Sequence, residues 1–381
     1  MNQPPKSYQI CSRTVMDTSD SRITFDFDNV CDHATDFYAN VLPVWHPDEV
    51  GERELQSIIV KVKNDGCKRD FDCILGLSGG VDSSYMLHLA VKEFGLRPLV
   101  FHVDGGWNSE LAVHNIQVLV DKLGVNLFTE VINWEEMRDF QLAWFKSGLP
   151  HLDLPQDHAF IATLYNFADK YGIKYILNGG NISTECVRNP MEFFYYGTDM
   201  IHIRDIMRRF GTVDMKTYPF SSILRHKIYL RYLRGIKVIR PLNYRPYVKA
   251  EAVRLLESEY GWRRYPQKHF ESRFTKFYES YWLPERFGFD PRRVQFSSLI
   301  LTGQMTRDDA LKCLAKPSYD PATIHQDFEY VATKLRISID ELNHYFTMPK
   351  KFYWDYRNHE WLFNAGARFL RVIGSEASIK R

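Results

Sequence analysis

Short apolar runs alternate with stretches of helical apolar spacing between residues 52 and 177. This alternation predicts strands and helices in turn, and therefore a parallel sheet covered by helices. Ligands in such sheets bind at the carboxyl ends of the strands, near the switch point. The predicted strands are Asp72–Leu77, Pro98–Val103, Leu127–Ile132 and Lys174–Leu177. The predicted helices are Glu52–Lys63, Ser109–Gly124, Trp134–Ser147 and Asp157–Tyr171, with one more opening at Asp82.

The alternation fades after residue 183, where aromatic and basic residues dominate. Helical spacing returns at Thr306–Leu314, Ile324–Leu335 and Ile339–Phe346. We therefore predict three regions. They are an N-terminal segment over residues 1–50, an α/β domain over 51–245 and a mostly helical region over 246–381.

Composition and charge narrow the class of protein. The 381 residues are 45% hydrophobic and 25% charged, as in a globular protein. No apolar run approaches a membrane span and the start lacks a signal-peptide core, so we expect a cytoplasmic protein without membrane insertion. The net charge of +2 argues against a nucleic-acid partner, but residues 201–300 hold 21 Lys and Arg against 9 Asp and Glu. This basic part is either a solvated surface or favours a large anionic ligand.

The most informative stretch is Leu75–Ser84, which reads Leu-Gly-Leu-Ser-Gly-Gly-Val-Asp-Ser-Ser where a strand turns into a helix. Its paired glycines let a ligand approach the main chain, and the helix N-terminus favours an anion. It fits neither the Walker A nor the dinucleotide pattern. It resembles instead the pyrophosphate loop of ATP pyrophosphatases, which adenylate a carbonyl oxygen; an ordinary glycine-rich turn is the alternative. The predicted ATP-binding residues here are Ser78, Gly79, Gly80, Val81, Asp82, Ser83 and Ser84.

Two further strand ends carry paired glycines beside polar residues. One follows Pro98–Val103 and the other follows Lys174–Leu177. We expect the backbone of His102, Val103 and Asp104, with Trp107, near adenine. We expect Gly179, Gly180 and Asn181 near the ribose or the α-phosphate. The alternative is that these glycines only end the strands.

Basic residues gather in Gln267–Phe277 and after Asp290. If the first stretch is helical, Lys268, Ser272 and Lys276 share one edge. Such a cluster would neutralise released pyrophosphate or the diphosphate of a nucleotide sugar, whereas a salt-bridged surface helix is the alternative. We assign Lys268 and Lys276 to catalysis together with Asp82. The residues assigned to substrate or pyrophosphate binding are His269, Glu271, Arg273, Arg292 and Arg293.

The N-terminal segment is similar to a zinc knuckle that has lost half of its ligands. Cys11 and Cys31 stand first in two Cys-x2-Cys positions, where Thr14 and Ala34 replace the second cysteines. Two thiolates and a misplaced His33 do not complete a tetrahedral site. We favour a metal-free knuckle over an unusual zinc site built on Cys11, Cys31 and His33.

Motifs along the chain point to one family. They are Cys11–Asp17, Asp72–Ser84, the Lys-His-Phe-Glu-Ser stretch at 268–272 and the stretch Ser297–Arg307, which ends in Gly-Gln-Met-Thr-Arg. Nearly end to end, the chain resembles the N-acetyl sugar amidotransferases of bacterial O-antigen (lipopolysaccharide) and flagellin-sugar biosynthesis. The loop indicates only the superfamily, and the last two stretches narrow it. The two lost knuckle cysteines depart from the family pattern.

The resemblance implies a Rossmann-like, adenine nucleotide α-hydrolase-like domain and an AMP-forming carbon–nitrogen ligase. The acetamido group of a nucleotide-activated sugar would be adenylated, and ammonia would then replace its oxygen to give an acetamidino sugar. The implied cofactors are ATP and Mg2+, with Asp82 positioning the metal on the β- and γ-phosphates. Because Cys186 is an unconvincing nucleophile, the resemblance implies ammonia from a separate glutaminase, in a pair resembling the glutaminase and cyclase subunits of histidine biosynthesis.

Two other functions stay open. A tRNA-modifying pyrophosphate-loop enzyme would need a catalytic cysteine pair or a strong RNA-binding domain, and the scattered cysteines and near-neutral charge disfavour it. A non-catalytic adenine-nucleotide-binding module need not keep the loop complete, and here the Ser-Gly-Gly-x-Asp-Ser sequence is complete.

Overall fold

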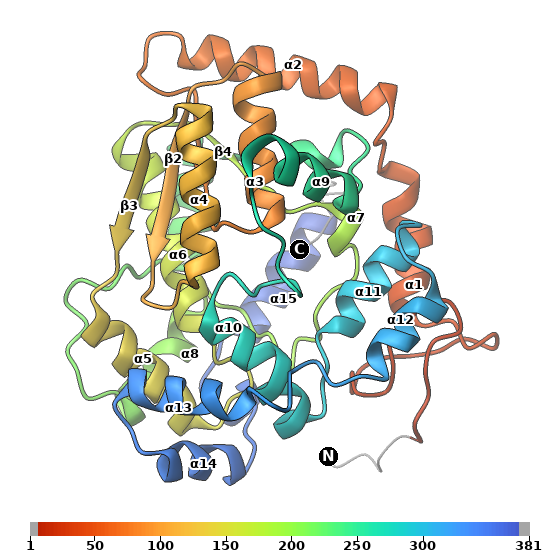
Figure 1. Ribbon diagram of the computed structural model, residues 1–381, viewed down its shortest axis with the longest axis vertical. Coiled ribbons are helices and arrows are strands. Elements are labelled where there is room, and N and C mark those ends of the chain that lie inside the picture. Colours follow the sequence, from red (N-terminus) through yellow and green to blue (C-terminus); the bar gives the residue numbers. More distant parts are fainter. Residues whose placement is uncertain (1–6, 373–381) are drawn as a thin grey trace.

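The computed structural model describes residues 7–372, and its centre is one parallel β-sheet (Figure 1). Within these residues five strands pair in the order β3-β2-β1-β4-β5, each pair parallel. Because β2 and β3 lie on one side of β1 and β4 and β5 on the other, the switch point lies between β1 and β4. The predicted parallel α/β fold is confirmed. The strands are β1 (Cys73–Gly76), β2 (Pro98–Asp104), β3 (Leu127–Val131), β4 (Tyr175–Leu177) and β5 (Lys237–Ile239).

Helices cover both faces of the sheet and build the lower half of the molecule in Figure 1. The helices up to the last strand are α1 (Asp32–Asp36), η1 (Phe37–Val41), η2 (Leu42–Val44), α2 (Glu49–Gly66), α3 (Val81–His88), η3 (Leu89–Glu93), α4 (Glu110–Leu123), α5 (Trp134–Ser147), α6 (Leu154–Lys170), α7 (Ile182–Glu185), α8 (Met200–Phe210) and η4 (Arg225–Leu233). After β5 follow η5 (Pro241–Asn243), α9 (Lys249–Tyr260), α10 (Arg273–Phe277), η6 (Tyr278–Phe287), α11 (Arg292–Leu301), α12 (Arg307–Leu314), α13 (Ile324–Leu335), α14 (Ile339–Thr347), η7 (Tyr353–Asp355) and α15 (Glu360–Val372).

Two apolar clusters flank the sheet, because successive strand residues point to opposite faces. Leu75 belongs to the cluster that contains residues of α2, α3, α4 and α9, whereas Ile74 belongs to the cluster that contains residues of α5 and α6. Phe274 and Val331 of the C-terminal helices belong to the second cluster. The C-terminal region therefore shares a core with one face of the sheet, and the predicted boundary at residue 245 stays a prediction. No helix in the part of the chain that the structure describes is long and apolar enough to cross a membrane.

The predicted elements up to β4 are confirmed within a few residues, whereas after β4 one strand was not predicted and one helix that was considered does not form. β5 was missed because it is only three residues long and begins with an exposed lysine. The stretch from Gln267 is not one helix: α10 starts at Arg273, and the Ser272 hydroxyl caps it by accepting the Thr275 N–H at 3.2 Å. Lys268 and Lys276 therefore do not share a helix edge.

The N-terminal segment folds as two linked turns around its cysteines. Cys11 Sγ accepts the N–H groups of Thr14 at 3.4 Å and Cys31 at 3.2 Å. His33 turns away from the thiols, and its Nε2 lies 2.9 Å from Asp20 Oδ2. Within residues 7–372 no group of three potential His, Cys, Asp or Glu metal ligands occurs.

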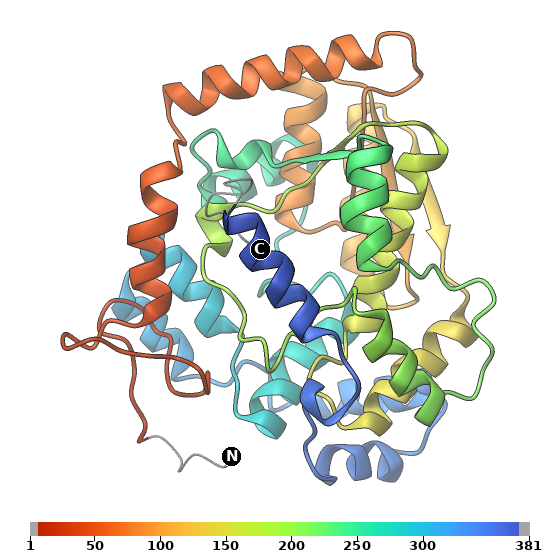
Figure 2. The ribbon, with the colours of Figure 1, turned by 180° about the vertical axis from the view of Figure 1, so that it is seen from behind.

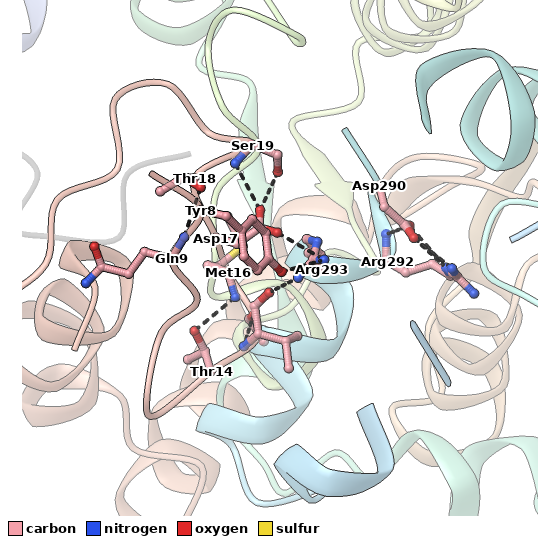
Figure 3. Close-up of polar contacts among 12 residues, drawn as sticks. Tyr8, Gln9, Thr14, Met16, Asp17, Thr18, Ser19, Asp290, Arg292 and Arg293 are labelled. Carbon is pink, nitrogen blue, oxygen red and sulfur yellow. Dashed lines mark hydrogen bonds and ion pairs between the residues drawn. The ribbon is translucent and has the colours of Figure 1, made fainter. Parts of the chain in front are cut away.

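Arginines of the C-terminal region fasten this segment to the rest of the molecule. Arg307 donates to the carbonyl oxygens of Cys11 and Thr14 at 2.9 Å each. Arg293 donates to the Val15 carbonyl at 2.8 Å and lies 3.0 Å from Asp17 Oδ2. Figure 3 shows Arg293 beside Asp17. The sequence stretches Cys11–Asp17 and Ser297–Arg307 therefore contact each other in the folded chain.

Candidate active site

The glycine-rich loop, residues 78–84, joins β1 to α3 at the switch point of the sheet. Gly80 is the extended N-cap residue of α3 and supplies no side-chain cap. Gly79 has a φ of +84°, and a Cβ there would lie 3.0 Å from the Ala112 carbonyl oxygen, so glycine is required. Because no side chain caps α3, the N–H groups of its first turn and the helix dipole form an anion-binding end.

Side chains from distant segments hold the loop in shape. Ser78 Oγ lies 3.0 Å from Ser83 Oγ, which links the two ends of the turn. The Trp262 indole N–H and the Tyr265 hydroxyl both donate to the Gly79 carbonyl, at 3.1 and 3.2 Å. A loop held this way is ordered before a ligand arrives, which lowers the entropic cost of binding.

The end of β4 packs directly on the first turn of α3. A Cβ on Gly179 would lie 2.8 Å from the carbonyl carbon and oxygen of Asp82, which are rigid backbone atoms. A Cβ on Gly180 would meet Asn178 Oδ1 at 2.8 Å, and this oxygen accepts the Gly180 N–H at 2.6 Å. The glycines after β4 thus allow the ends of β1 and β4 to approach each other.

A cavity of about 850 Å³ opens at these strand ends. That volume is in the upper part of the range for small-molecule sites. The loop, the ends of β2 and β4, and segments after residue 248 all contribute to its wall. Their roles in binding stay predictions. Of the residues predicted from the sequence, the wall contains Ser78, Gly80, Val81, Asp82, Ser83, His102, Val103, Gly179, Gly180, Lys268, His269, Glu271 and Arg292.

Two lysines and their carboxylate neighbours set the charge of the cavity. Lys268 Nζ lies 2.6 Å from Glu185 Oε1. Burial lowers the pKa of Lys268, but the Glu185 and Asp82 carboxylates outweigh it and raise the pKa. Burial also lowers the pKa of Lys249, and here the opposing effect of Asp82 does not restore it. An anion placed between the lysines would favour the charged form of both.

Asp82 is held by a tyrosine. Its Oδ1 accepts the Tyr247 hydroxyl at 2.5 Å, and Tyr247 is only 3% exposed. Burial raises the pKa of the Tyr247 phenol well above its usual value, and the Asp82 carboxylate adds to the shift. The Tyr247 phenol therefore keeps its proton, donates a hydrogen bond to the Asp82 carboxylate and orients that carboxylate in the first turn of α3.

Glu271 lies against the loop rather than between the lysines. A Cβ on Gly80 would stand 2.7 Å from Glu271 Oε1, so this carboxylate reaches the N-terminus of α3. The backbone carbonyl of Glu271 accepts the Ser109 N–H at 2.9 Å, which ties the segment to the start of α4. The Lys-His-Phe-Glu-Ser stretch thus forms one wall of the cavity.

His269 is strained and charged. Its φ of +66° is left-handed, which is uncommon for a histidine. Its Nδ1 lies 2.9 Å from Glu279 Oε2. Burial lowers the pKa of the imidazole, but the Glu279 carboxylate outweighs this and raises the pKa to about 9. The ring is therefore an imidazolium cation at neutral pH, in the wall of the cavity.

Polar residues at the strand ends shape turns. His102 Nδ1 lies 2.8 Å from the Leu77 carbonyl and its Nε2 lies 2.9 Å from the Asn108 amide nitrogen, so both ring nitrogens are engaged. Asp104 Oδ1 accepts the Gly106 N–H at 2.8 Å. Asn181 likewise caps α7 through its side chain. Asp104 and Asn181 therefore support the cavity without lining it.

Other predicted residues also lie outside the cavity wall. Trp107 is fully buried and donates its indole N–H to Gln141 at 2.7 Å, so the expected contact with adenine is not met. Lys276 Nζ lies 2.6 Å from Asp327 Oδ2. The remaining predicted residues outside the wall are Gly79, Ser84, Arg273 and Arg293.

Arg292 lines the cavity but its guanidinium is occupied. Its Nη2 lies 2.7 Å from Asp290 Oδ2, and Figure 3 shows the two side chains directed at each other. Further donors reach the carbonyl oxygens of Cys313 and Lys316, at 3.2 and 2.9 Å. The geometry favours a structural role, joining α11 to the end of α12, over pyrophosphate binding.

Gln304 of the Gly-Gln-Met-Thr-Arg stretch connects segments around the cavity by hydrogen bonds. Gln304 Nε2 donates to the carbonyl oxygens of Ser183 and Tyr247, at 3.1 and 3.2 Å. Gln304 Oε1 accepts the Lys249 N–H at 3.0 Å. One glutamine therefore links α7, Tyr247 and Lys249, the segments that surround Asp82.

Sequence reasoning missed Glu185, Tyr247 and Lys249. Glu185 lies one helical turn beyond the glycines after β4, and that proximity was a usable signal. Tyr247 lies between β5 and α9 and Lys249 is the first residue of α9, and neither stands beside a glycine pair, so they carry no comparable signal.

Comparison with known proteins finds a family match for the C-terminal region. Residues 271–369 match a family described as LPS biosynthesis protein WbpG-like, C-terminal domain. In this region the chain is similar to that family. The predicted resemblance to a lipopolysaccharide-biosynthesis family is thus confirmed. The WbpG-like region contributes Glu271, Ser272, Arg292, Gln295, Phe296, Leu299, Cys313, Lys316 and Pro317 to the cavity.

Solved structures show a more remote likeness. NMN synthetase from Francisella tularensis is 14% identical, with 57% of this chain and 98% of that chain covered and a TM-score of 0.28. NH3-dependent NAD synthetase from Campylobacter jejuni is also 14% identical, with 79% and 98% covered and a TM-score of 0.30. The chain matches no curated protein.

Proposed function

We propose that the protein is an ATP-dependent, AMP-forming amidotransferase that converts the acetamido group of a nucleotide-activated N-acetyl sugar into an acetamidino group. One observation carries the proposal: the glycine-rich loop and the WbpG-like region line the same cavity. A phosphate-binding end and a region matched to lipopolysaccharide biosynthesis thus share one space, as a reaction between ATP and a sugar requires.

The chemistry needs two steps, because an amide oxygen is a poor leaving group. The amide oxygen bonds to the α-phosphorus of ATP while the bond from that phosphorus to pyrophosphate breaks. Ammonia then adds to the imidate carbon, loses a proton, and the carbon–oxygen bond to AMP breaks. The task of the protein is to hold ATP and amide in line and to neutralise the pyrophosphate.

We assign those tasks to the residues of the cavity. The first turn of α3 receives the departing pyrophosphate, and Lys268 and Lys249 supply positive charge across from it. The carboxylates of Asp82 and Glu185 line the same space and are the oxygen ligands that Mg2+ prefers. When bound, Mg2+ would neutralise phosphate charge.

We further propose that ammonia comes from a separate glutaminase. Cys11, Cys31 and Cys73 are buried, and Cys186 Sγ donates to the Ser298 carbonyl at 3.7 Å. The thiols of Cys11 and Cys186 hydrogen-bond to backbone groups, whereas glutamine hydrolysis needs a thiol with a histidine base. Cys67 and Cys313 are exposed.

The test is to incubate the full chain with ATP, Mg2+ and candidate nucleotide N-acetyl sugars, with either ammonium chloride or glutamine. We expect AMP, pyrophosphate and a product in which NH replaces oxygen, with ammonium only. Product formation with glutamine alone would refute the separate glutaminase. ATP binding without AMP formation for every amide sugar tried would favour a non-catalytic module.

A further inference from the structure

The helix η4 (Arg225–Leu233) turns its apolar face outward. Ile228, Tyr232 and Leu233 are 52%, 63% and 74% exposed, and Leu224 just before the helix is 61% exposed. These positions recur at helical spacing, so they form one stripe. Only Leu230 of the described side chains in η4 is fully buried, where it joins the core. We call the exposed stripe, Leu224, Ile228, Tyr229, Tyr232 and Leu233, the η4 surface.

The η4 surface lies on the outside of the molecule and is firmly attached. Figure 2 shows η4 as the green helix standing beside α6, and the two helices are in contact. Arg225 and Arg234, at either end of η4, both form ion pairs with Asp169 of α6. The helix is thus held by Leu230 and by the arginines at its ends, while its other large apolar side chains face out.

Positive charge surrounds the stripe. Residues 224–237, which are η4 and its flanks, contain five Lys and Arg and no Asp or Glu. The guanidinium carbons of Arg225 and Arg231 lie 5.5 and 5.6 Å from the ring centroids of Tyr229 and Tyr232, so the cations flank the exposed rings. Lys237, at the start of β5, is also exposed.

Exposed apolar residues next to cations favour one kind of binding partner for the η4 surface over another. A two-fold contact with a second copy would place the cations of one η4 against those of the other, which is unfavourable. An anionic phospholipid surface complements both features, because apolar residues enter the acyl boundary, tyrosines lie at the headgroup level and cations meet phosphates. A continuous exposed apolar stripe is otherwise uncommon on a globular protein.

We propose that η4 docks the protein on an anionic phospholipid surface, lying in the headgroup layer without crossing it. The proposal rests on the η4 surface alone and is independent of the reaction in the cavity. It predicts reversible binding that weakens as salt rises, since one short helix and a few cations give a modest attraction.

Co-sedimentation of the full chain with extruded vesicles tests the proposal. We expect binding to vesicles of phosphatidylcholine with phosphatidylglycerol at low salt, and little binding to phosphatidylcholine alone. The double substitution Ile228→Glu/Leu233→Glu should lower the bound fraction at least tenfold. A matched control is Val60→Glu/Val113→Glu, because these valines on α2 and α4 are similarly exposed, at 56% and 54%. The control should bind like the parent chain.

A charge-only variant gives a second, independent readout. Arg231→Gln/Lys237→Gln should flatten the dependence of binding on salt while leaving the apolar stripe in place. Absence of binding to anionic vesicles at low salt, or equal binding of both double glutamate variants, would overturn the proposal. It would also be overturned by a concentration-dependent dimer that Ile228→Glu/Leu233→Glu abolishes and that excludes vesicles, because the η4 surface would then belong to a second copy.

Discussion

The ammonium group of Lys268 lies 2.6 Å from Glu185 Oε1, and both side chains line the cavity beside the glycine-rich loop. Lys268 comes from an irregular segment before α10, and Glu185 ends α7, so the pair joins two distant parts of the chain. A carboxylate partner keeps Lys268 charged in the absence of ligand, and a bound phosphate can replace that partner.

Lys268 and Lys276 each pair with a carboxylate, but only Lys268 lines the cavity, so substituting each in turn tests the role of the cavity. Lys268→Met should lower the rate of AMP formation about a hundredfold, as loss of a charge-stabilising group does in other enzymes. Lys276, also 2.6 Å from a carboxylate but outside the wall, provides the matched comparison. Lys276→Met should change the rate by less than about threefold. Steady-state pyrophosphate release measures both, and equal losses would contradict the assignment of Lys268.

Two aspartates provide a second matched pair. Asp82→Asn keeps the shape of the side chain but removes the charge that the proposed Mg2+ site requires, so AMP formation should fall by about two orders of magnitude or more. Asp104→Asn should have little effect, because an amide oxygen can still accept the Gly106 N–H. Both variants should unfold near the midpoint of the parent chain. Retained activity of Asp82→Asn would remove Asp82 from the mechanism.

The glycines after β4 should differ in their tolerance of alanine. At Gly179 the added Cβ would stand 2.8 Å from backbone atoms of Asp82, which cannot move without shifting α3. We expect Gly179→Ala to lower the free energy of unfolding by about 1–3 kcal/mol and to weaken ATP binding. At Gly180 the obstacle is the Asn178 side chain, which can rotate, so Gly180→Ala should be milder. Urea unfolding and nucleotide titration measure both, and the reverse order would contradict the described packing.

The His269–Glu279 pair should make stability depend on pH. The pKa of His269 is raised from its usual value near 6.5 to about 9, so the pair stabilises the folded state fully below about pH 6.5. This contribution is lost as pH rises through about 9. The difference in unfolding free energy between parent and Glu279→Gln should therefore shrink between pH 6.5 and 9.5. Because His269 is 40% exposed, solvent weakens the effect.

His269→Asn is the control for that measurement. Asparagine tolerates the left-handed backbone of this position but does not titrate. In the His269→Asn background, the effect of Glu279→Gln on the free energy of unfolding should be the same at every pH between 6.5 and 9.5. A pH dependence that survives there would assign the titration to another group.

Much of the α/β half follows from local pattern. The strands β1 and β2 are short, largely apolar runs, α4 repeats apolar residues at helical spacing, and Gly79 and Gly80 mark the turn between β1 and α3. Local pattern was misleading at Gln267–Phe277, where the spacing of Lys268, Ser272 and Lys276 fits a helix. The left-handed backbone of His269 and the Ser272 cap prevent that helix from forming.

The sequence by itself determined the parallel sheet, the glycine-rich loop between β1 and α3 and the likeness to a polysaccharide-pathway family, because each is recorded in stretches of residues close together in the chain. Only the tertiary structure decided that Lys268 faces the cavity and Lys276 does not, that Arg292 is occupied by Asp290, and that Lys249 belongs to the site. Each of these outcomes depends on which distant segments pack together. Which segments pack together depends on the fit between complete helix and sheet surfaces. The spacing of residues within one helix or strand does not contain that information.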